Sequence, residues 1–170
     1  MTQRALEVVG NESGLDYEAL FRSTYPKLVV ALSVASGPEA AADAVQDAFV
    51  QAHRHWAHVV TLENPGAWVR RAAINRLSNQ RRGLRRREAA VERLAVPVPP
   101  VELAPVDLDL ARAIAALPAR QRLAVCLHYL GDLPVADVAA ALDVSVGTVK
   151  SNLHDARRAL KQRLGDQHDG

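Results

Sequence analysis

The stretch 133–164, LPVADVAAALDVSVGTVKSNLHDARRALKQRL, constrains the fold more than any other part of the chain. Its apolar residues recur at spacings of three and four, which predicts two helices separated by a break at Asp143 and Val144. Pro134 suits the first turn of the first helix, and Ser145 can cap the second by accepting a backbone N–H. Two helices around so short a turn are typical of a helix-turn-helix unit.

The second of these helices is predicted to be amphipathic. Its apolar back consists of Val146, Val149, Leu153, Ala156 and Leu160. Its polar, mostly basic front consists of Ser151, His154, Arg158 and Gln162, flanked by Thr148, Lys150, Asp155 and Lys161. Such a face can enter the major groove of DNA, where side chains read base edges. An amphipathic surface helix of a bundle is the alternative interpretation of this stretch by itself.

The same stretch resembles the carboxy-terminal helix-turn-helix of bacterial sigma factors of the extracytoplasmic-function (ECF) group, within the sigma-70 family. The run GTVKS and the Ala-Arg pair that follows one turn later carry the likeness. It implies that the second helix reads the promoter −35 element through Thr148, Lys150, Ser151, Asn152, His154, Arg157 and Arg158. Asn152 and Asp155 depart from the family pattern, which often has Arg at these positions.

The charge of the chain is unevenly distributed. The formal net charge is only +2 over 170 residues, yet nine arginines and only two glutamates lie between Arg70 and Arg93. This local excess indicates a polyanionic partner. A helix is predicted from Gly66 to about Leu94, capped by Asn64 and opened by Pro65. Guanidinium groups bind phosphate in two-point geometry, and asparagine can pair with base edges.

The run ENPGAWVRRAAINRLSNQRRGLRRR resembles the sigma segment that binds and opens the −10 element. In that family the preceding loop, here 61–64, holds a flipped base. The resemblance implies −10 contacts by Thr61, Leu62, Glu63, Asn64, Arg71, Asn75, Ser78, Asn79 and Arg82. Trp68 is the single aromatic residue of the run, which predicts weak intrinsic melting because aromatic stacking supports unpaired bases.

Two further helices are predicted at 16–35 and 38–56. The run DAVQDAFVQAHRHW in the second resembles the sigma segment that docks on the clamp helices of the largest polymerase subunit. By position, the implied contacts with core polymerase are Asp43, Gln46, Asp47 and Val50, while Phe49 is expected to point into the core. A solvated charged face would explain the same pattern without a partner.

The pattern as a whole predicts an all-α chain of two small helical domains joined by a Pro-rich linker, the second domain containing the helix-turn-helix. Further helices are expected at 108–116 and 119–130. The predicted boundaries are a tail at 1–15, a region-2-like domain at 16–95, a linker at 96–106, a region-4-like domain at 107–165 and a tail at 166–170.

Several other classes of function lack support in the sequence. No nucleophile–base pair or phosphate-binding glycine loop is recognisable, so we predict neither an enzyme nor a cofactor. His53, His55 and His58 are too unfavourably spaced on a helix to converge on a metal. The single cysteine, Cys126, lies in an apolar run and is expected to be buried. With no membrane span or secretory signal predicted, we expect a cytoplasmic protein.

The resemblance covers about 16–94 and 107–164, and it implies a transcription initiation factor. Such a factor binds the clamp and the flap of core RNA polymerase, reads the −35 element, and reads and melts the −10 element. An anti-sigma factor is a further partner that the family suggests. A stand-alone helix-turn-helix regulator and a protein-interaction adaptor with a degenerate reading helix are the alternatives.

Overall fold

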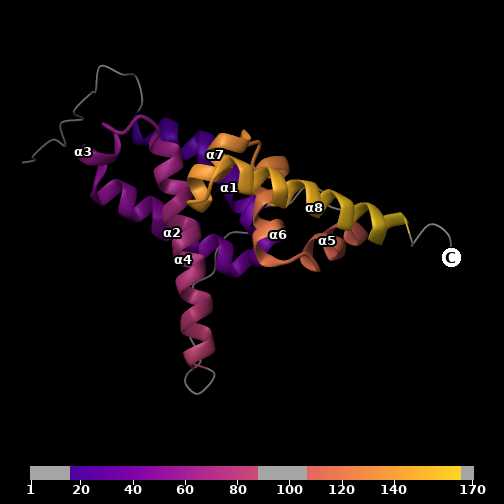
Figure 1. The fold of residues 1–170 in the computed structure, drawn as a ribbon. Helices are drawn as coiled ribbons and strands as arrows, with labels where there is room; N and C mark the ends of the chain where they lie inside the picture. The colour runs from indigo at the N-terminus through magenta and orange to yellow at the C-terminus, as the bar shows by residue number, and fades with distance from the viewer. Residues whose placement is uncertain (1–15, 88–106, 166–170) are drawn as a thin grey trace, which may run out of the picture.

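The computed structural model describes residues 16–87 and 107–165, and these form helices and the turns between them (Figure 1). The first group of helices is α1 (Tyr17–Ser36), α2 (Pro38–Arg54), α3 (Trp56–Val59) and α4 (Pro65–Arg87). The second group is α5 (Leu108–Ala115), α6 (Ala119–Val125), the π-helix η1 (Cys126–Leu130), α7 (Val135–Leu142) and α8 (Val146–Gly165). The predicted all-α fold is confirmed, whereas the predicted tails and linker lie outside the described residues.

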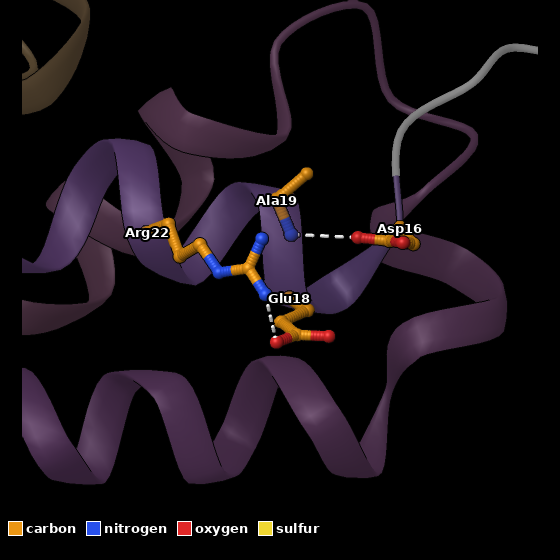
Figure 2. Close-up of polar contacts among 4 residues, drawn as sticks. All are labelled: Asp16, Glu18, Ala19 and Arg22. Atoms are coloured by element: carbon orange, nitrogen blue, oxygen red, sulfur yellow. Dashed lines mark hydrogen bonds and ion pairs between the residues drawn. The ribbon is translucent and has the colours of Figure 1, made fainter.

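Helix α1 begins where local chemistry predicts. The Asp16 carboxylate accepts a hydrogen bond of 2.6 Å from the backbone N–H of Ala19, which satisfies one donor of the first turn (Figure 2). Glu18 and Arg22 form an ion pair one turn apart on the exposed side. The helix continues through Pro26 and ends at Gly37, whose φ of 92° favours glycine.

Helices α1, α2 and α4 pack around a shared apolar core. Helix α2 contacts both of the others, and Leu32, Val45 and Val69 are fully buried between them. Phe49 is buried as expected, and its carbonyl accepts a hydrogen bond of 3.1 Å from the Tyr17 hydroxyl. The predicted second helix is interrupted at His55, so that Trp56 belongs to the separate short helix α3.

The second group is organised around α8, which contacts α5, α6 and α7. The predicted helix at 119–130 changes at Cys126 from α-helix to π-helix. Cys126 is buried, as expected, and burial raises the pKa of its thiol to about 12. The π-turn ends at Gly131, where a side chain would lie 2.6 Å from the Leu127 carbonyl oxygen.

The helix-turn-helix prediction is confirmed in its local details. Helix α7 ends at Asp143, which adopts the left-handed conformation with φ 56° and ψ 48°. The Ser145 hydroxyl then accepts a hydrogen bond of 3.1 Å from the backbone N–H of Thr148 at the start of α8. Val149, Leu153 and Ala156 are buried, but the expectation for Val146 is wrong: it is 42% exposed because it precedes the packed turns of α8.

The two groups pack against each other. Helix α1 contacts η1, α5 and α6, while α4 contacts α7, and one cluster of buried apolar residues runs through both groups. In Figure 1 the end of α4 projects from this body, and α8 extends away on another side. The chain is therefore folded back on itself, which the sequence did not predict.

We predict that Gly131→Ala lowers the free energy of unfolding by about 1–3 kcal/mol, because the new methyl group would overlap a backbone oxygen that cannot easily move. Gly147→Ala is the matched control, since a side chain there would lie 3.8 Å from the Ser145 hydroxyl. Its stability should stay the same or rise by up to ~1 kcal/mol. Urea denaturation followed by circular dichroism measures both, and equal stabilities would contradict the packing described for η1.

Candidate nucleic-acid interface

The outer face of α8 presents most of the predicted −35 residues to solvent. Lys150, Ser151, His154, Arg157 and Arg158 are exposed, whereas Thr148 and Asn152 are half-buried. The Thr148 hydroxyl lies 2.8 Å from that of Ser145 and so takes part in capping the helix. Helices α5, α6 and α7 cover the opposite side, so α8 is held rigidly with one free polar face.

Arg157 differs from its neighbours on this face. Its Nε donates to the Leu153 carbonyl at 3.1 Å, and one terminal nitrogen donates to the Tyr129 hydroxyl of η1 at 3.4 Å. These contacts draw the guanidinium toward the body of the second group. The remaining N–H donors of this exposed guanidinium can still bind a phosphate.

The exposed side chain of Val146 is a candidate contact that the sequence analysis missed. It stands at the first position of α8, the end of a reading helix that approaches base edges most closely. A small apolar side chain there can contact a thymine methyl group. Val146 belongs to the apolar repeat of the helix and was therefore expected on the buried side. Periodicity alone does not show at which residue the packing of a helix begins.

A surface groove of about 520 Å³ runs along α4 beside α2. It is lined by Gln51, Trp68, Arg71, Ala72, Asn75, Arg76 and Asn79. The structure thus brings together three predicted −10 residues, Arg71, Asn75 and Asn79, with an aromatic ring. Cations, amides and one aromatic side chain form a surface suited to an unpaired nucleic-acid strand.

The other predicted −10 residues do not line this groove, and two of them make hydrogen bonds that stabilise the loop and the start of α4. Ser78 is half-buried and does not line the groove, and the side chain of Arg82 lies outside the part described. The Asn64 side-chain oxygen accepts a hydrogen bond of 2.9 Å from Ala67 N–H, so the predicted cap of α4 is confirmed. Thr61 donates to the His58 carbonyl at 2.7 Å, while Leu62 is half-buried and Glu63 exposed.

The predicted polymerase-binding residues lie along the outer side of α2, but two of them are engaged by α4. Asp47 forms an ion pair of 2.7 Å with Arg76, and Asp43 accepts a hydrogen bond of 2.5 Å from Gln80. Gln46 is exposed, and Val50 is 47% exposed despite its apolar side chain. Arg76 therefore connects the acidic side of α2 with the groove, a link that spacing along one helix does not reveal.

Comparison with known protein families matches both halves of the chain. Residues 20–87 match the family model described as Sigma-70 region 2, and residues 107–160 match Sigma-70 region 4. The ECF RNA polymerase sigma factor SigM of Mycobacterium tuberculosis is 33% identical, covering 98% of this chain and 85% of that protein. The chain belongs to the sigma-70 family.

Other relatives are also sigma factors. The RNA polymerase sigma-E factor of Streptomyces coelicolor is 28% identical over 88% of this chain and 86% of its own length. Among solved structures, the sigma factor RpoE of Bartonella quintana, crystallised in complex with the anti-sigma factor NepR, has a TM-score of 0.66 and 28% identity. That match covers 87% of this chain and 95% of the solved one. The protein is thus a transcription initiation factor that directs RNA polymerase to promoters.

The parts of the chain that the structure describes contain neither a metal-binding cluster nor a helix that could span a membrane. In 16–87 and 107–165, no three His, Cys, Asp or Glu side chains are grouped so that they could hold a metal ion. Over the same residues, no helix combines the length and the apolar character that crossing a membrane requires.

Proposed function

We propose that this sigma factor divides its work among three surfaces. The exposed face of α8 reads the −35 element, the groove along α4 with the loop before it binds and opens the −10 element, and the outer side of α2 docks on the clamp helices of core polymerase. The groove that gathers Arg71, Asn75 and Asn79 around Trp68 is the observation that carries this proposal. Its polar residues are of the types that bind a nucleic-acid strand, while Trp68 and Ala72 also pack against the apolar core.

On α8 we infer two kinds of contact. Lys150 and Arg158 are exposed cations and would bind phosphates, which positions the helix without reading sequence. Ser151 and His154 lie between them on the exposed face and can hydrogen-bond to base edges, and Val146 adds an apolar contact. Asn152 is half-buried and contributes less than its position in the family pattern suggests.

At the −10 element, the groove must compensate for unstacking a base, which costs a few kcal/mol. Trp68 is the aromatic residue available in the groove, and stacking on one ring recovers ~1–3 kcal/mol. Arg71 and the two asparagines then contribute phosphate and base-edge contacts. Stacking on a single ring recovers little more free energy than unstacking the base costs. We therefore expect efficient opening only at promoters close to the preferred sequence.

Partners follow from this division of work. The second group would bind the flap of core polymerase, which holds the two DNA-reading surfaces at a fixed separation and lets two weak sites act together. An anti-sigma factor is a further proposed partner, supported by the solved relative crystallised with one. The protein would act by binding rather than by catalysis, and in the cytoplasm, where promoter DNA and polymerase are found.

For the polymerase-docking surface, we predict that Val50→Arg weakens association with core polymerase at least tenfold, because it places a cation in an apolar contact. Val50 is already exposed, so the fold should be retained. Leu108→Arg on α5 is the control, since Leu108 is also an exposed apolar residue. Fluorescence anisotropy of labelled protein titrated with core polymerase measures both. Equal affinities for the two variants would exclude Val50 from the docking surface.

The two DNA-reading surfaces should fail in different ways. Arg158→Ala should weaken closed-complex binding across sequences and reduce the salt slope by roughly one, as expected for a lost phosphate contact. Asn75→Ala should leave closed binding nearly intact but impair opening, which permanganate reactivity of unpaired thymines reports. A promoter with a premelted bubble should partly restore transcription by the Asn75 variant and not by the Arg158 variant. Equal rescue of both, or of neither, would refute the proposed division.

A further inference from the structure

Asp155 is an unusual charge on the reading helix α8. It is half-buried, and it stands four residues after Ser151 and directly after His154, the two proposed base contacts. Residues four apart on a helix are neighbours on its surface. Asp155 therefore lies at the edge of the exposed face, where α8 would approach the base edges of DNA.

No partner among the described residues accounts for this carboxylate. The other aspartates of the described residues cap a helix, pair with a lysine or arginine, or accept a hydrogen bond from a side-chain amide. Asp155 does none of these, although Arg158 follows it by three residues, a spacing that permits an ion pair. The buried side-chain atoms that lack a partner in these residues are Arg70 Nε and Arg122 Nε, so the oxygens of Asp155 are open to an outside group.

Helix stability does not explain this residue either. Asp155 lies in the middle of α8, which runs from Val146 to Gly165. A carboxylate stabilises a helix mainly in its first turn, through capping and the helix dipole. In a helix interior, aspartate is among the less favourable residues, because its side chain competes for backbone hydrogen bonds. Folding of α8 therefore gains nothing from a carboxylate at this position.

Contact with DNA imposes a requirement on this carboxylate. The exposed cations of the same helix would bring it close to phosphates; they include Lys150, Arg157, Arg158 and Lys161. A carboxylate near a phosphate is repelled, and a carboxylate that loses its water without gaining a donor is costly. Asp155 is therefore compatible with tight binding only where the DNA presents a hydrogen-bond donor to it.

Among the base edges of the major groove, cytosine suits a carboxylate best. Its N4 amino group donates a hydrogen bond, whereas guanine presents two acceptors and thymine one. Adenine donates through N6, but its N7 places an acceptor beside the second carboxylate oxygen. Ser151 and Asp155 are about 6 Å apart along the helix axis, which is less than two base-pair steps of ~3.4 Å. The base that faces Asp155 is therefore close to the one that faces Ser151.

We propose that Asp155 makes the −35 element specific for cytosine at one position, by accepting a hydrogen bond from the cytosine N4 amino group. This inference rests on the proposed function, because it requires that α8 enters the major groove. The carboxylate selects sequence more than it adds affinity, since it repels DNA that lacks a donor at this position. Lys150 and Arg158 supply the attraction to phosphates that holds the helix in place.

Selection from a promoter library tests this proposal. The full-length protein bound to core polymerase is mixed with promoters whose −35 element is randomised, and the bound DNA is sequenced. We expect the original chain to enrich cytosine at least fivefold over each other base at one position. Asp155→Asn should move this preference to adenine, because an amide pairs with adenine N6 and N7. Asp155→Ala should reduce the enrichment at this position below twofold and leave the other positions as they are.

Asp109→Asn is the matched control, because it removes a carboxylate of α5 that pairs within its own helix, with Arg112. Its base preferences should equal those of the original chain. The proposal is overturned if both Asp155 variants keep the original preferences, or if the position that they alter prefers a base other than cytosine in the original chain. A uniform gain of binding to all sequences would also overturn it, since Asp155 would then only repel DNA.

Failure of the proposed function has a separate signature. If the original chain bound to polymerase shows no base preference at any −35 position, the proposed role of α8 fails, and the role of Asp155 fails with it. If the original chain selects −35 bases and both Asp155 variants select the same ones, α8 keeps its proposed role and only the role of Asp155 is refuted.

Discussion

The contact of α1 and α4 with η1 and α7 is the interaction on which the rest of the structure depends. Through it, one continuous apolar core replaces two separate small ones, each of which would bury a smaller fraction of its surface. The same contact brings the helix-turn-helix beside the groove that is proposed to hold the −10 strand. The apolar packing of the two groups therefore also fixes where the helix-turn-helix lies relative to this groove.

Local features of this fold could be predicted from the sequence because their causes lie within a few residues. Asn64 and Ser145 cap their helices, and the break at Asp143 follows from the signals around it. Burial of Phe49 and Cys126 followed from their apolar surroundings. The resemblance to the family supplied the functional assignment, which no amphipathic pattern could have provided alone, because a surface helix of a bundle has the same period.

What the sequence could not predict depends on contacts between distant segments. The pairing of Asp47 with Arg76 and of Asp43 with Gln80 requires α2 and α4 to lie side by side, and spacing within one helix carries no information on this. The exposure of Val146 depends on where packing against α8 begins. The ion pairs of Arg70 with Asp137 and of Arg71 with Asp143 join residues more than 60 positions apart, so only the folded chain reveals them.

Hydroxyl-radical footprinting of one promoter, with the protein alone and with the protein bound to core polymerase, tests the central claim most directly. The account predicts little protection by the protein alone at any concentration that saturates polymerase, because each reading surface is weak until polymerase holds the two at a fixed separation. With core polymerase, protection should extend over both the −35 and the −10 elements. Strong protection of either element by the free protein would contradict the account and would favour a stand-alone helix-turn-helix regulator.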